Sequence, residues 1–217
     1  MRRTRTDFDS ARWVEGLRSL AERNPVEFPP ELVPPHFKHS AVLIVFWPED
    51  ESLRVLLTRR SSRMSRHAGE VAFPGGLLEE GETPKEAALR EAQEEVGLDP
   101  GTIEVVGRLD DAWSGAGSHM VPFVALAERR PSLVPSPAEV DEILTPDVRE
   151  LLRPEARSWD VVERQGVQYR NDVIEFDGGS TYGLTTDILL ETLERAQGEP
   201  SVRGYIRLGQ LVIYHHE

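Results

Sequence analysis

The sequence predicts an α/β protein of the α+β type, built as a mixed α/β sandwich. Strand-like and helical segments interleave along the chain, but they lack the regular strand–helix–strand spacing that a doubly wound parallel sheet requires. The chain has 217 residues and a mass of 24.4 kDa, which favours one principal domain with added segments. Its hydrophobic content of 39% and charged content of 29% are typical of a globular protein.

The first 35 residues predict a helix followed by a proline-rich connector. Residues 10–23 carry apolar side chains at helical spacing, and the helix should end at Asn24-Pro25, because the residue before a proline disfavours the helical conformation. The apolar stripe consists of Trp13, Val14, Leu17, Leu20 and Ala21. We expect this segment to serve packing or dimerisation.

Residues 36–198 form the predicted main domain, and residues 199–217 a C-terminal strand extension. A hairpin is indicated by two apolar runs, 40–47 and 53–59, on either side of the turn Pro48-Glu49-Asp50-Glu51. The remaining predicted strands are 71–73, 103–109, 120–126 and 167–176, with one or two more in 202–216. The remaining predicted helices are 83–97, 145–152 and 184–196.

The helix between Thr83 and Gly97 has clear boundary signals. Thr83 suits the cap position, Pro84 the first helical position, and Glu86 completes a capping box with Thr83. Gly97 is a natural end of the helix, because glycine adopts the left-handed conformation that follows many helices.

Three acidic side chains of this helix predict a metal site. Glu91, Glu94 and Glu95 stand at i, i+3 and i+4, so their carboxylates share one side of the helix. Such crowding costs energy unless a cation offsets it. Mg²⁺ and Mn²⁺ prefer oxygen ligands, and main-chain carbonyls of the preceding pair Gly75 and Gly76 can contribute to such a site.

The same stretch resembles the box that defines the Nudix hydrolases. From Gly76 to Leu98 it reads GLLEEGETPKEAALREAQEEVGL. The defined positions of the box are filled by Gly76, Glu82, Arg90, Glu91, Ala92, Glu94, Glu95, Gly97 and Leu98. The resemblance implies a mixed sheet between helices and an enzyme that hydrolyses a nucleoside diphosphate linked to another moiety.

The resemblance also implies roles for individual residues. Glu91, Glu94 and Glu95 are the implied Mg²⁺ or Mn²⁺ ligands, helped by a main-chain carbonyl of Gly75 or Gly76. Arg90 is expected to hold a box carboxylate in place, and Glu82 to act through water. A carboxylate after the box, Glu139 or Glu142, is a further candidate ligand or general base. For the base we favour Glu94 or Glu95, which would take a proton as water attacks one phosphorus.

The segment before the box resembles the signature of the coenzyme A pyrophosphatase branch of that family. It reads LLTRRSSRMSRHAGEVAFPGG from Leu56 to Gly76, and it departs from the signature at Ser65, where the branch usually has arginine. The resemblance implies cleavage of coenzyme A or a derivative to 3′,5′-ADP and 4′-phosphopantetheine. Arginine binds phosphate through a bidentate fork, which agrees with a substrate that carries an additional 3′-phosphate. The expected substrate-binding residues are Arg60, Arg63, Arg66, Phe73, Gly75 and Gly76. Tyr182, further along the chain, could stack on a base or pack in the core.

Two other functions stay open. One is the same chemistry on ADP-ribose, a dinucleoside polyphosphate or an oxidised nucleotide, and the other is a nucleotide-binding module without catalysis. The formal charge of −13 speaks against nucleic acid as a partner. No apolar run is long enough to span a membrane, and the basic N-terminus lacks the apolar core of a secretory signal. The absence of cysteine agrees with a reducing cytoplasm.

Overall fold

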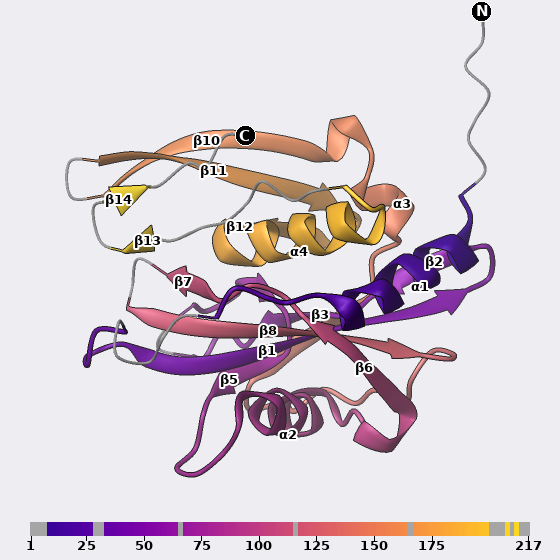
Figure 1. Cartoon of the computed structure of the whole chain (residues 1–217), viewed down its shortest axis with the longest axis horizontal. Helices are drawn as coiled ribbons and strands as arrows, with labels where there is room; N and C mark the ends of the chain where they lie inside the picture. The colour runs from indigo at the N-terminus through magenta and orange to yellow at the C-terminus, as the bar shows by residue number, and fades with distance from the viewer. Residues whose placement is uncertain are drawn as a thin grey trace, which may run out of the picture.

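The structure is a computed structural model that describes residues 8–27, 33–64, 67–114, 117–164, 167–199, 207–208 and 211–212. A mixed β-sheet lies between helix α2 (Pro84–Val96) on one face and helices α1 (Ser10–Arg18) and α4 (Gly183–Ala196) on the other (Figure 1). The predicted α+β class and the mixed sheet between helices are therefore confirmed. Among the described residues, no helix is long and apolar enough to cross a membrane.

The central sheet has six strands arranged around β1 (Lys38–Glu49) and β8 (Ser118–Ala127), which run parallel to each other. Strands β2 (Ser52–Val55) and β5 (Gly75–Leu77) pair antiparallel with β1. Strands β6 (Ile103–Arg108) and β7 (Ala112–Ser114) pair antiparallel with β8. The pairing of β5 with β1 brings the glycine pair of the box against the centre of the sheet.

Strand β1 separates two hydrophobic cores, because successive side chains of a strand point to opposite faces. Ala41, Leu43 and Val45 face α2 and pack with its Ala88 and Ala92. On the opposite face, the core contains Val42, Ile44 and Phe46 of β1, Trp13 and Leu17 of α1, and Leu189 and Leu193 of α4. Burial on both faces explains why residues 40–47 read as a continuous apolar run rather than an alternating one.

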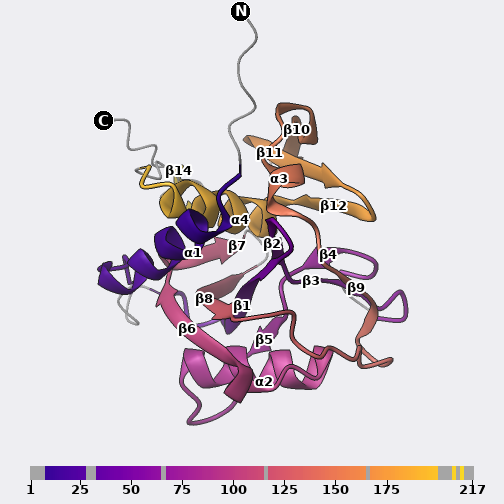
Figure 2. The ribbon, with the colours of Figure 1, turned by 90° about the vertical axis from the view of Figure 1, so that its right-hand side faces the viewer.

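Smaller sheets flank this centre (Figure 2). Strand β3 (Leu57–Arg60) pairs with β4 (Val71–Ala72) and β9 (Val140–Leu144), and this sheet leads into the glycine pair. A meander of β10 (Arg157–Arg164), β11 (Val167–Phe176) and β12 (Gly179–Tyr182) precedes α4. The remaining elements are helix α3 (Val148–Leu151), the 3₁₀ turns Ser19–Glu22, Pro100–Thr102 and Pro154–Ala156, and the short strands β13 (Arg207–Leu208) and β14 (Leu211–Val212).

Most predicted elements are present, with local differences at their ends. The helix predicted over 10–23 ends at Arg18 and continues as a 3₁₀ turn, which leaves Ala21 exposed. The helix predicted from Thr145 begins at Val148, because the side chain of Asp147 accepts a hydrogen bond from the Arg149 N–H and caps it there. Strands β5, β7, β9, β10 and β12 were not predicted. The division of the chain at residues 35 and 198 stays a prediction.

Candidate metal centre

Helix α2 is built as its sequence predicts. The Thr83 hydroxyl accepts a hydrogen bond from the Glu86 N–H, and the Glu86 carboxylate accepts one from the Thr83 N–H, so the capping box is complete. Gly97 ends the helix in the left-handed conformation, with φ of 64°. The helix therefore has fixed ends, and its acidic side chains project from a rigid frame.

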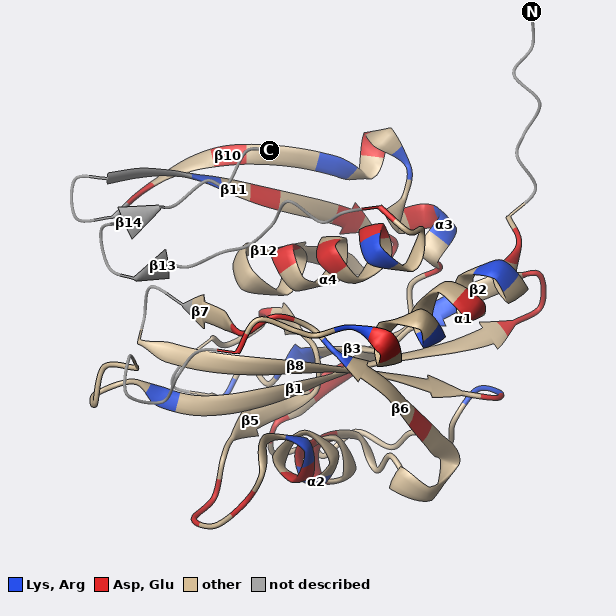
Figure 3. Cartoon of the chain, viewed as in Figure 1, with Lys and Arg blue, Asp and Glu red and all other residues tan. Residues whose placement is uncertain are grey.

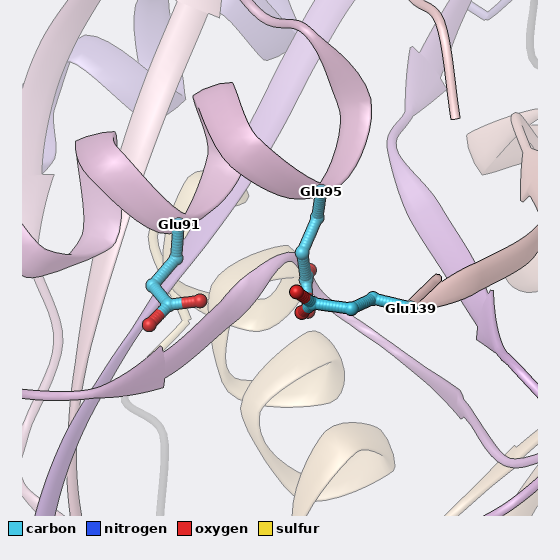
Figure 4. A group of neighbouring side chains, drawn as sticks. All are labelled: Glu91, Glu95 and Glu139. Atoms are coloured by element: carbon cyan, nitrogen blue, oxygen red, sulfur yellow. The ribbon is translucent and has the colours of Figure 1, made fainter. Parts of the chain in front are cut away.

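Three carboxylates converge beside this helix. Glu91 and Glu95 project from α2 toward Glu139, which precedes β9, and one oxygen from each of the three lies within 4.8 Å of the others (Figure 4). The Glu95 side chain is 2% exposed and that of Glu91 14% exposed. Three acidic groups at this separation repel one another, whereas a hard divalent cation prefers such oxygen ligands. The donor set therefore fits Mg²⁺ or Mn²⁺.

The surroundings of the two helix carboxylates raise their pKa values. Burial raises the pKa of Glu95 to about 7, although the Arg60 guanidinium and the Gly75 N–H both favour its charged form. Burial also raises the pKa of Glu91, against the opposing effect of Arg90. Ionised carboxylates at these positions are costly without a compensating cation.

Arg90 connects the acidic residues of the box. Its Nε and Nη2 donate to the two Glu82 oxygens at 2.8 and 3.0 Å, and its Nη1 donates to Glu91 at 2.9 Å and Glu94 at 3.1 Å. Nη2 also donates to the Leu77 carbonyl at 3.0 Å. These bonds place Arg90 where it holds box carboxylates together. They leave Glu94, which is 56% exposed, on the solvent side and outside the group of three.

The two glycines before the box have no room for a side chain. A Cβ on Gly76 would lie 2.3 Å from a Glu91 carboxylate oxygen, and a Cβ on Gly75 would lie 2.3 Å from the Ala41 carbonyl of β1. The Gly75 N–H donates to Glu95 at 3.2 Å. Because its glycines allow close backbone approach, β5 lies directly against the carboxylates of Glu91 and Glu95.

Glu139 reaches the helix because its turn is tied to the helix end. The Ser136 N–H donates to the Glu95 carbonyl and the Val134 N–H to the Val96 carbonyl, each at 2.8 Å. The Glu139 carbonyl in turn accepts a hydrogen bond from the Ser61 N–H at 2.8 Å. Figure 3 shows that acidic residues also lie on the loop that leads into α2.

The other predicted site residues lie at different distances from this centre. Arg60 Nη1 approaches Glu95 at 3.4 Å, and Arg63 donates to the Pro137 carbonyl in the turn before Glu139. Phe73 is buried in the core at 3% exposure, so it supports the glycine pair rather than presenting a surface. Arg66 and Ser65 lie outside the described residues.

The structure separates the two acidic candidates that follow the box. Glu142 pairs with Arg59 Nε at 3.0 Å and is 51% exposed, on the side of β3 away from Glu95. Only three positions separate Glu139 from Glu142 in the sequence, and no local pattern decides between them. The hydrogen bonds of residues 134–139 to α2 and β3 are the distinguishing feature.

Comparisons with known proteins show the family to which the chain belongs. Residues 37–165 match the NUDIX domain family. The chain is 34% identical over 174 residues to an uncharacterized Nudix hydrolase NudL of Photorhabdus laumondii, an alignment covering 78% of this chain and 90% of that protein. It is 35% identical over 161 residues to the mitochondrial Nudix hydrolase 15 of Arabidopsis thaliana, covering 70% of this chain.

The chain spans 56% and 58% of the lengths of the two Arabidopsis relatives, Nudix hydrolases 15 and 22. Among solved structures, a MutT/nudix family protein from Enterococcus faecalis superposes with a TM-score of 0.51 at 15% identity, covering 85% of this chain and 69% of that one. This likeness supports the fold. Together with the family match over more than half of the sequence, these findings show that the chain belongs to the NUDIX family.

Proposed function

We propose that the protein is a metal-dependent hydrolase that cleaves the pyrophosphate bond of a nucleoside diphosphate derivative. The convergence of Glu91, Glu95 and Glu139 carries this proposal. We assign Mg²⁺ or Mn²⁺ to these three carboxylates, with the main-chain carbonyl of Gly75 as a further ligand. When bound, such an ion neutralises charge on the phosphoryl oxygens and lowers the pKa of a bound water.

We assign the proton transfer to Glu94. Its carboxylate is exposed to solvent and is oriented by Arg90 Nη1, so it can accept a proton from an attacking water while the other three carboxylates hold the cation. Arg90 is a positioning residue in this scheme. Glu142 fits the role of base less well, because it is paired with Arg59.

Three glutamine variants test these assignments. Glu94→Gln should lower kcat by about 10²- to 10⁴-fold while Mn²⁺ binding, measured by calorimetry, persists. Glu95→Gln should lose Mn²⁺ binding as well as activity, and Glu142→Gln should stay close to wild type in both. Near-full activity in both Glu94→Gln and Glu95→Gln would refute the site.

For the substrate, we propose coenzyme A or a derivative, with 3′,5′-ADP and 4′-phosphopantetheine as products. The support is the signature-like segment from Leu56 to Gly76, which folds as β3, β4 and β5 and brings Arg60 next to Glu95. The alternatives are ADP-ribose, a dinucleoside polyphosphate or an oxidised nucleotide as substrate, and a binding module without catalysis. Retention of every box carboxylate favours an enzyme over such a module.

Product analysis by mass spectrometry separates these alternatives. The purified protein with Mg²⁺ or Mn²⁺ is offered coenzyme A, acetyl-coenzyme A, ADP-ribose, diadenosine polyphosphates and oxidised dGTP. Fastest release of 3′,5′-ADP supports coenzyme A. Faster turnover of another compound replaces the substrate assignment, and absence of turnover with either metal supports the binding module.

We further propose a cytoplasmic location without nucleic-acid or membrane partners, given the absence of cysteine and the net charge of −13.

We also propose that the protein forms a homodimer through the edge of β10. Within the described residues β10 pairs with β11 only, and Trp159 and Val161 on it are 59% and 55% exposed. An antiparallel pair of β10 strands centred on Asp160 sets Trp159 opposite Val161 and Arg157 opposite Glu163 of the second copy. Each such pair contributes roughly 0.2–1 kcal/mol, and the exposed Asp160 pair opposes them by a similar amount.

A charge swap tests this dimer. Arg157→Glu places two acidic residues opposite each other and should shift the protein toward monomer in light-scattering measurements of mass. The double variant Arg157→Glu/Glu163→Arg restores opposite charges and should restore the dimer. A wild-type protein that stays monomeric at all concentrations would refute the proposal.

A further inference from the structure

A cavity lies apart from the carboxylate group of Glu91, Glu95 and Glu139. It has a volume of about 550 Å³, within the range of small-molecule sites, and it opens between the β3–β4 hairpin and strands β11 and β12. The residues that decide its chemistry are Arg59, Glu70, Val71, Glu175, Phe176 and Tyr182. No box residue lines it.

One residue links this cavity to the metal centre. The Arg60 N–H donates to the Glu70 carbonyl at 2.9 Å and the Gly69 N–H donates to the Arg60 carbonyl at 3.0 Å, and both Glu70 and Gly69 line the cavity. The Arg60 guanidinium lies on the opposite side of β3 from the cavity, close to the Glu95 carboxylate. Because neighbouring side chains of a strand point to opposite faces, Arg59 faces the cavity while Arg60 faces the carboxylates. Strand β3 therefore separates the cavity from a ligand bound at the carboxylates.

The charges of the cavity disfavour phosphate. Its carboxylates are Glu70 and Glu175, and its guanidinium, Arg59, is already bound to the Glu142 carboxylate and to the Gly178 carbonyl. A phosphate placed here would meet two acidic groups without a free cationic partner among the lining residues. The cavity therefore suits an uncharged part of a ligand.

The remaining lining offers an apolar floor with hydrogen-bonding groups at its rim. Val71 and Phe176 are buried at 5% and 8% exposure, and Tyr182 is 43% exposed. Burial, together with the hydrogen bond of the Tyr182 hydroxyl to Glu70, raises the pKa of Tyr182 to about 12, so its hydroxyl stays protonated. A Cβ on Gly179 would lie 3.4 Å from Val71 Cγ2, so a larger residue there would narrow the space.

We propose that this cavity holds the uncharged, amide-bearing pantetheine arm of the substrate. This inference rests on the proposed function. The Glu70 carboxylate accepts a hydrogen bond from an amide N–H of the arm, the Tyr182 ring covers its methylene groups, and Phe176 and Val71 form the floor. The phosphates stay on the opposite side of β3, with the carboxylates and Arg60. Tyr182 is thus a specificity residue contributed by a strand far outside the box.

Two products of the proposed reaction serve as separate probes of the two sites. Calorimetry with 4′-phosphopantetheine and with 3′,5′-ADP is compared between wild type, Tyr182→Ala and Val26→Ala, the last as an exposed apolar residue outside the cavity. We expect Tyr182→Ala to weaken 4′-phosphopantetheine binding about tenfold and to leave 3′,5′-ADP binding unchanged. Val26→Ala should alter the binding of neither probe. Equal weakening of both probes by Tyr182→Ala, or no effect, would overturn the assignment.

Kinetics separate failure of this inference from failure of the proposed function. With an active enzyme, Tyr182→Ala should raise KM for coenzyme A about tenfold and leave KM for ADP-ribose, which lacks the arm, within twofold. A protein that hydrolyses none of the pyrophosphates refutes the proposed function, whereas calorimetry with 4′-phosphopantetheine still decides the role of the cavity. A Tyr182→Ala protein with unchanged unfolding temperature excludes a folding defect as the cause.

Discussion

Replacement of Glu95 by glutamine should make the metal-free protein more stable at alkaline pH while it removes the metal site. Glu95 is 2% exposed, and burial raises its pKa to about 7 from the ordinary 4.5. Arg60, the Gly75 N–H, Glu91 and Glu139 are the groups that act on it. Glutamine has nearly the same shape as the protonated carboxyl and keeps an oxygen for the Gly75 N–H, so it removes the cost of the buried charge.

The size of the effect follows from the shift in pKa. A folded-state pKa above the unfolded one means that the folded protein holds more protons between pH 4.5 and 7, so stability falls as pH rises through this window and levels off above it. With about 1.36 kcal/mol per pKa unit, the wild type should be less stable than Glu95→Gln by about 1 kcal/mol at pH 5.5 and by about 3 kcal/mol at pH 8.5.

Urea unfolding at several pH values in metal-free buffer measures this difference. Glu94→Gln is the matched control, because Glu94 is the neighbouring helix residue but is 56% exposed; its change should stay below about 0.5 kcal/mol at each pH. Adding Mg²⁺ should stabilise the wild type and not Glu95→Gln, because ligand binding to the folded state adds stability. A Glu95→Gln protein that is no more stable than wild type at pH 8.5 would refute the reasoning.

Three further outcomes are expected. Gly76→Ala, whose Cβ would lie 2.3 Å from a Glu91 oxygen, should lower kcat/KM by about 10²-fold and weaken Mn²⁺ binding in calorimetry; wild-type values would contradict the close packing. Arg90→Lys cannot keep the paired bonds to Glu82 and should lower the free energy of unfolding by roughly 1–2 kcal/mol, as urea titration would show. Removal of divalent ions by EDTA should abolish hydrolysis, and Mg²⁺ or Mn²⁺ should restore it; activity that survives EDTA would exclude the metal-dependent mechanism.

Local signals made much of the fold predictable. The capping box at Thr83 and the glycine at position 97 define both ends of α2 from the sequence alone, because these interactions span only a few residues. The parallel pairing of β1 with β8 joins segments that lie far apart in the sequence, and no local pattern specifies it. Strand β9 was missed because its acidic residues, Asp141 and Glu142, interrupt the apolar pattern.

Helix geometry made only part of the candidate site predictable from the sequence. Residues at i, i+3 and i+4 lie on one side of a helix, but adjacent residues differ by about 100° around its axis. Glu91 and Glu95 therefore point toward Glu139, whereas Glu94 is turned toward Arg90, one turn before it. The spacing predicts that the three box carboxylates share one side of the helix, but it does not specify which of them meet at one point. The third member of the group comes from a turn whose position depends on tertiary hydrogen bonds.

Those hydrogen bonds connect the proposed substrate-binding segment to the proposed metal centre. The Ser61 N–H, within the signature-like segment, donates to the Glu139 carbonyl, while the Ser136 N–H donates to the Glu95 carbonyl. Glu139 is therefore held between β3 and α2, and a displacement of β3 moves the carboxylate as well as Arg60. A substitution in the signature-like segment should for this reason change metal affinity together with substrate affinity. Under the proposed function, metal binding and substrate binding share this strand, so we expect their energetics to be coupled rather than additive.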